Sequence, residues 1–161
     1  MIKKFSRWLL YKRLGWTADV NVELPQKCVI CLAPHTSNWD FVYSMLYGKA
    51  EGLKSNFLMK KEWFFWPLGP IFRKLGGIPV YRNKKSSMTD NLAETAMREK
   101  SFRLAITPEG TRKANPEWKR GFYYIALKAG IPILLYGLDF ERKLIYCHRS
   151  FVPAGDVEKD M

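Results

Sequence analysis

The chain has 161 residues, of which 47% are hydrophobic, and this size and composition fit one domain with a single core. Its 27 Lys and Arg residues against 15 Asp and Glu give a net charge of +12, which indicates an anionic partner: nucleic acid, an anionic bilayer or a phosphate-bearing substrate. No apolar run reaches the roughly 18 residues that a bilayer-spanning helix needs. The aromatic content of 15%, with six Trp, excludes a disordered basic tail and suits a protein at a membrane interface.

The first residues, MIKKFSRWLLYKRLGW, alternate basic and apolar side chains at helical spacing. Residues 2–13 are predicted to form an amphipathic helix, within a membrane-surface segment of residues 1–22 that precedes the main domain, residues 23–161. Because Leu10 and Leu14 lie off the apolar face, a helix packed on its own domain is the alternative. The apolar face carries Ile2, Phe5, Trp8, Leu9 and Trp16, with Lys3, Lys4 and Arg7 opposite.

The same N-terminal stretch lacks the continuous apolar run and the small-residue cleavage site of a secretory signal. We therefore expect an intracellular protein.

After Pro25, short β-rich runs alternate with helical patterns. Such alternation requires crossover connections, so we predict a single α/β domain with a largely parallel open sheet and helices on its faces. The expected strands are residues 28–33, 56–60, 76–82, 102–107 and 132–140, and the expected helices are residues 39–50, 86–100 and 121–130. Residues 144–151 are expected to add a last strand at an edge, and residues 156–161 to fray.

Cys28 and Cys31 form a CxxC motif inside an apolar run that is predicted to be a strand. Three residues apart on a strand, their side chains leave opposite faces. A zinc or redox site also needs a second pair of ligands, for which Cys147 and His148 are poor substitutes. We expect buried, reduced thiols and no metal site.

Residues 63–72, WFFWPLGPIF, are apolar and aromatic but are interrupted by Pro67, Gly69 and Pro70. These breakers argue against one long helix. Two interpretations remain open: core packing, or a lip that dips into lipid or borders an acyl chain.

His35 lies in LAPHTSNWDF, where a predicted strand ends, a polar turn follows and a helix begins. Reactive groups of open α/β sheets collect at such strand ends. On a continuous helix His35 and Asp40 would point about 140° apart, so they meet only if Thr36, Ser37 or Asn38 caps the helix after a turn. A carboxylate bound to one imidazole nitrogen leaves the other free to take a proton from a hydroxyl. A solvated His near a capping Asp is the alternative.

Three further segments follow predicted strands: residues 76–82 (GGIPVYR), 107–112 (TPEGTR) and 129–137 (AGIPILLYG). Together with PHTSNWD they resemble, in order and spacing, the four sequence blocks of the glycerolipid acyltransferase family, over about residues 28–138. His35, Ser37 and Asp40 match its HxSxxD block, Gly77 through Arg82 its glycine-to-arginine block, and Pro108 through Arg112 its PEGTR block.

The resemblance implies transfer of a fatty acyl group from acyl-CoA or acyl carrier protein to a lysophospholipid hydroxyl, lysophosphatidic acid first, with no cofactor and no acyl-enzyme. It makes His35 the general base and Asp40 its partner. Arginine offers phosphate a planar fork of donors, and a Gly-containing turn lets backbone N–H groups approach an anion. The implied acceptor-binding residues are Ser37, Arg82, Glu109, Gly110, Thr111 and Arg112.

Some roles remain open at this level. Glu109 is as well explained by a carboxylate that pins its loop or pairs with an arginine. The oxyanion stabiliser is expected to be a backbone N–H of the PEGTR loop or of the helix start. Pro34 stands where the family often has Asn, and the fourth block has one proline rather than two, so acceptor identity is less determined than reaction type.

Two alternatives accompany this hypothesis. The first keeps the chemistry but changes the acceptor to another lyso-lipid, such as a lyso-aminolipid, or another membrane alcohol. The second is a non-enzymatic basic protein that binds membrane or nucleic acid; because no helix-turn-helix, finger or RNP-like segment is recognised, nucleic acid is not an expected partner. The expected partners are an anionic membrane surface, a lysophospholipid and the thioester donor, at a cytoplasmic, peripheral position on the inner face of the membrane.

Overall fold

The computed structural model describes residues 1–81, 85–111 and 117–160. Seven strands form one sheet in the order β1-β7-β6-β2-β5-β3-β4. Neighbouring strands from β6 to β4 are all parallel, whereas β7 runs antiparallel to β6. The strands are β1 (Thr17–Val20), β2 (Lys27–Leu32), β3 (Asn56–Lys60), β4 (Gly77–Val80), β5 (Phe102–Ile106), β6 (Ile133–Asp139) and β7 (Leu144–Phe151). The predicted largely parallel α/β sheet is confirmed.

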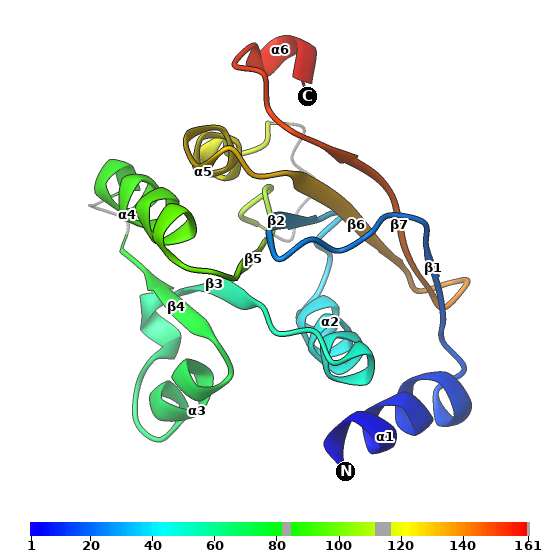
Figure 1. Cartoon of the computed structure of the whole chain (residues 1–161). Helices are drawn as coiled ribbons and strands as arrows, with labels where there is room; N and C mark the ends of the chain where they lie inside the picture. The colour runs from blue at the N-terminus through cyan, green and yellow to red at the C-terminus, as the bar shows by residue number, and fades with distance from the viewer. Residues whose placement is uncertain (82–84, 112–116, 161) are drawn as a thin grey trace.

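Helices cover both faces of the sheet (Figure 1). Helices α4 (Lys85–Arg98) and α5 (Gly121–Ala129) lie on one side, and α1 (Ile2–Arg7), α2 (Asn38–Glu51) and α3 (Leu68–Lys74) lie on the other. The remaining helical elements are η1 (Trp8–Arg13), which continues α1, the short turn η2 (Lys61–Trp63), and α6 (Val157–Asp160). The two faces are called here the α4/α5 side and the α1/α2/α3 side.

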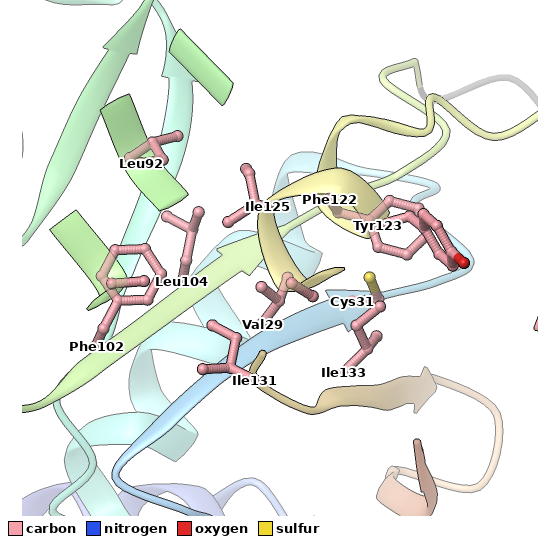
Figure 2. Packing of buried hydrophobic residues seen from close by; sticks show 12 residues of the cluster. Val29, Cys31, Leu92, Phe102, Leu104, Phe122, Tyr123, Ile125, Ile131 and Ile133 are labelled. Carbon is pink, nitrogen blue, oxygen red and sulfur yellow. The ribbon is translucent and has the colours of Figure 1, made fainter. Parts of the chain in front are cut away.

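Each face of the central strands has its own apolar core. Figure 2 shows the first, where Val29 and Cys31 of β2 pack with Phe122 and Tyr123 of α5. The second core contains Cys28 of β2 with residues of α2 and η1. Cys28 and Cys31 therefore belong to opposite cores, as their spacing predicted, and both side chains are buried.

The edge of the sheet differs from the prediction. Residues 144–151 form β7 as expected, but β7 lies between β6 and β1, so the expectation that it is an edge strand was wrong. The true edge is β1, a four-residue strand parallel to β7 that the sequence did not reveal. Its side chains are mostly exposed, so it lacks the apolar alternation by which a strand is recognised.

The N-terminal helix combines features of both interpretations offered for it. Leu10, which lies off the predicted apolar face, is fully buried and belongs to the second core. Of the predicted apolar face, Ile2, Phe5 and Trp8 are more than half exposed, whereas Trp16 is buried in the second core. The helix thus packs on its domain through one stripe and presents an apolar stripe outward.

The C-terminal residues are ordered rather than frayed, which corrects the prediction for residues 156–161 over the part that the structure describes. The carboxylate of Asp160 accepts hydrogen bonds from the Tyr123 hydroxyl (2.6 Å) and from the Ala154 backbone N–H (2.7 Å). The Tyr123 hydroxyl in turn accepts one from the Gly155 N–H (3.0 Å). A buried tyrosine of α5 thereby holds the chain end in place.

The hydrogen bonds that join Asp160 to Tyr123 and Ala154, called here the clasp, make the stability of the protein depend on pH. The hydrogen bond from Tyr123, and then that from Ala154, lower the pKa of Asp160, so the stabilisation is present above the ordinary carboxyl pKa and is lost as pH falls through the lowered one. Tyr123→Phe should lower Tm by about 2–4 °C at neutral pH, and the difference from wild type should shrink as pH falls through the lowered pKa of Asp160. Calorimetry across this pH range would test it; an unchanged difference would contradict the clasp.

Candidate functional site

The candidate site lies where β2 ends and α2 begins. Ser37 is the N-cap of α2, and its Oγ accepts a hydrogen bond from the Trp39 N–H (3.1 Å). Asp40, three residues later, accepts from the Ser37 N–H (2.8 Å), which completes a capping box. The spacing Ser-x-x-Asp thus forces the turn that the sequence analysis required between His35 and the helix.

The same carboxylate holds the histidine. Asp40 Oδ2 lies 3.0 Å from His35 Nδ1 and also accepts the Thr36 N–H at 2.6 Å. Asp40 is fully buried, whereas the His35 side chain is 19% exposed. Because a carboxylate only accepts hydrogen bonds, this geometry assigns the Nδ1–H tautomer to neutral His35. Its Nε2, which has no hydrogen bond to the residues that the structure describes, is left as a base.

A second loop meets the first from the neighbouring strand. β5 is parallel to β2 and pairs with it up to Cys31 and Ile106, so both strands end at the same edge of the sheet. Beyond β5, Glu109 is almost completely buried, and its Oε1 accepts the His35 backbone N–H at 3.3 Å. The PEGTR loop therefore contacts the backbone of the proposed base itself.

Gly110 shapes the remainder of this loop. Its φ of 64° lies in the left-handed region that glycine tolerates best, and its N–H bonds to the Thr107 carbonyl (3.1 Å). The Lys119 side chain lies directly across Gly110, where an added Cβ would meet the flexible amine end of that lysine. Lys119 therefore places a cation beside the turn.

The predicted residues are distributed as follows. His35, Ser37, Asp40 and Glu109 form one connected hydrogen-bond network, and Gly110 and Thr111 follow directly in the same loop. Ser37 acts here as a helix cap, and its contact with substrate stays a prediction. Arg82 and Arg112 lie outside the described residues.

Sequence reasoning missed three contributors. The bond from the Thr36 N–H to Asp40 is local to the turn, whereas the contact between Glu109 and His35 depends on where two loops meet, which no local pattern reveals. Lys119 is nine residues after Gly110 in a basic stretch, and only the fold places its side chain beside Gly110. The N–H groups of Thr36, Ser37 and Trp39 are already engaged within the turn, so these three are not available as oxyanion donors.

The described residues contain no group of three or more His, Cys, Asp or Glu side chains able to hold a metal ion. The three cysteines are free and buried. Burial raises the pKa of Cys28 to about 11 and raises those of Cys31 and Cys147 as well. These thiols are protonated at neutral pH and lack the environment of reactive cysteines.

The family model described as acyltransferase matches residues 19–135. The structure is similar to that of the 1-acyl-sn-glycerophosphate (LPA) acyltransferase PlsC from Thermotoga maritima, with a TM-score of 0.61 and 18% sequence identity over 96% of this chain and 68% of that chain. A search of curated proteins found no match.

The burial of the three cysteines predicts that their thiols react slowly in the native protein. Native protein at about pH 8 should react with a thiol reagent such as dithiobis-nitrobenzoate far more slowly than unfolded protein, because each cysteine is both protonated and covered. Titration with and without denaturant checks this expectation. Rapid labelling of even one cysteine in the native protein would contradict it.

Proposed function

Because the chain belongs to the acyltransferase family, we propose that it transfers a fatty acyl group from acyl-CoA or acyl carrier protein to a lysophospholipid hydroxyl, with lysophosphatidic acid as the preferred acceptor. The observation that carries this proposal is the 3.0 Å contact between His35 Nδ1 and the buried Asp40 carboxylate. Family membership also removes the alternative of a non-enzymatic basic protein.

The chemistry follows from the tautomer. The Nε2 lone pair of His35 takes the proton of the acceptor hydroxyl as its oxygen attacks the thioester carbonyl carbon. The resulting imidazolium is stabilised by Asp40. When the C–S bond breaks, His35 returns the proton to the departing thiolate, so the products are an ester and a thiol and His35 is neutral again.

The acceptor hydroxyl is the nucleophile in this scheme because the described residues offer His35 no enzyme nucleophile. Ser37 Oγ is engaged with the Trp39 N–H rather than with the imidazole. The cysteines are buried in the cores on either side of the sheet. Acyl transfer therefore proceeds directly from donor to acceptor.

A phosphate-bearing acceptor is supported by the positions of the basic residues. Arg82 and Arg112 follow β4 and β5 in sequence, and both strands belong to the same parallel set as β2. Parallel strands end at the same edge, so we propose that these arginines bind the phosphate near His35. Lys119, which lies over Gly110, supplies a further cation beside the loop.

The acceptor is a membrane lipid, so we also propose a peripheral position on the inner face of the cytoplasmic membrane. Among the described residues, no helix combines the length and apolar character needed to cross a bilayer. The exposed apolar stripe of α1 and η1, beside Lys3, Lys4 and Arg7, suits a helix that lies on an anionic surface.

The direct test is thioester consumption by purified protein with long-chain acyl-CoA or acyl carrier protein as donor and lysophosphatidic acid in mixed micelles. His35→Ala should reduce the rate by about 10²–10⁴, because the general base is gone. No transfer by folded wild type from either donor would contradict the proposal.

Two variants sharpen this test. Asp40→Asn should also lose most of the rate, because an amide does not stabilise the imidazolium. Ser37→Ala removes only the Oγ cap, should cost about 1 kcal/mol of stability, and should keep the backbone N–H that holds Asp40.

A monoacylglycerol acceptor, which lacks the phosphate, checks the phosphate preference. If Arg82→Ala reduces transfer to lysophosphatidic acid and to monoacylglycerol equally, Arg82 does not bind phosphate.

A further inference from the structure

Residues 61–74, called here the aromatic segment, expose large apolar side chains. Trp66 is 85% exposed, and Phe65, Ile71 and Trp63 are between 41% and 54% exposed. Core packing, one of the two interpretations of this stretch, therefore fails for these four side chains. They leave an apolar surface that no other part of the described chain covers.

The exposure does not come from a loose loop. Gly69 lies so close to the Phe64 backbone that a Cβ there would stand 2.7 Å from the Phe64 carbonyl oxygen, and its N–H bonds to the Phe65 carbonyl at 2.6 Å. The Phe64 ring packs edge-on against Phe72, with ring centroids 6.1 Å apart. Phe64 and Phe72 thus anchor the segment and hold Phe65 and Trp66 outward.

Cations lie within the aromatic segment and directly beside it. Arg73 lies over the Phe64 ring at 5.4 Å, and Lys61 lies over the Tyr81 ring at 5.0 Å. Lys60 and Lys74 are exposed at the two ends of the segment, against one acidic side chain, Glu62. Tryptophan and basic residues side by side are the composition of surfaces that rest in the headgroup region of anionic bilayers.

The aromatic segment also lies on the same side of the sheet as α1 (Figure 1). Large apolar side chains that are exposed gather on this α1/α2/α3 side, whereas α4 and α5 expose only Met97 and Tyr124 among the residues described. On the α1/α2/α3 side they are Ile2, Phe5, Trp8, Trp39, Val42, Trp63, Phe65, Trp66 and Ile71. One bilayer can therefore meet both the N-terminal helix and the aromatic segment.

We infer that the aromatic segment is a second membrane-docking site, which inserts Phe65 and Trp66 into an anionic bilayer while Lys60, Lys61, Arg73 and Lys74 contact its headgroups. Together with the N-terminal helix it orients the α1/α2/α3 side toward the membrane. The inference deepens the proposed function, since it rests on an acceptor that resides in a bilayer. Two contacts fix an orientation that one helix alone leaves free to rotate.

The test measures partitioning onto sedimentable vesicles of phosphatidylcholine and phosphatidylglycerol, with no acyl donor present. The double substitution Phe65→Ser with Trp66→Ser should weaken partitioning about tenfold or more. Phe5→Ser with Trp8→Ser should weaken it independently. Met97→Ser with Tyr124→Ser, whose side chains are 58% and 46% exposed but lie on the α4/α5 side, is the control and should change it less than about twofold.

Three outcomes would overturn the inference. The first is unchanged partitioning of the Phe65/Trp66 variant, with Tm equal to that of wild type. The second is self-association of wild type that this variant loses while vesicle binding stays the same, which would make the surface an interface with a second copy. The third is a transfer rate of the Phe65/Trp66 variant that is lower than that of wild type with a monomeric, short-chain lysophosphatidic acid. This result would place the aromatic segment along the acyl chain.

A failure of this inference is distinguishable from a failure of the proposed function. His35→Ala should bind vesicles as wild type does, because docking precedes chemistry. The Phe65/Trp66 variant should keep the wild-type rate on the monomeric acceptor and lose rate on vesicle-bound acceptor. Vesicle binding without any transfer would leave docking intact and reject the acyltransferase mechanism.

Discussion

One buried carboxylate organises the candidate site. Asp40 caps its own helix, accepts the backbone N–H groups of Thr36 and Ser37, and binds His35, all through Oδ2. A charge without solvent is tolerated only when hydrogen bonds compensate its desolvation. Because the same bonds build the turn and fix the imidazole tautomer, folding of this loop also orients the proposed base. Glu109 extends the network from the next strand.

The parallel sheet explains why distant sequence blocks act together. β2 and β5 are neighbours, and β3 and β4 continue the same parallel set, so the segments that follow β2, β4 and β5 all begin at one edge. Helices on both faces bury the strands and leave this edge for chemistry. The α1/α2/α3 side adds an apolar and basic surface, which we propose orients the enzyme toward the membrane that holds its acceptor.

Much of this arrangement could be predicted from local patterns, and the exceptions have physical reasons. Alternating strands and helices indicated the sheet, and the HxSxxD spacing indicated the pairing of His35 with Asp40, because a capping box is a local feature. The edge strand β1 was missed since exposed polar residues carry no alternation. The contact of Glu109 with His35, the placement of Lys119 and the clasp of Asp160 on Tyr123 join residues distant in sequence, so only the folded chain reveals them.

The central claim is that His35 activates the hydroxyl of the acceptor, with no acyl-enzyme. The most direct measurement mixes wild-type protein with long-chain acyl-CoA or acyl carrier protein in the absence of acceptor, then records thiol release and the intact protein mass after rapid quenching. The account predicts no stoichiometric burst of thiol and no mass increase until lysophosphatidic acid is added. A burst equal to the enzyme concentration, with an acyl group on the protein, would contradict it.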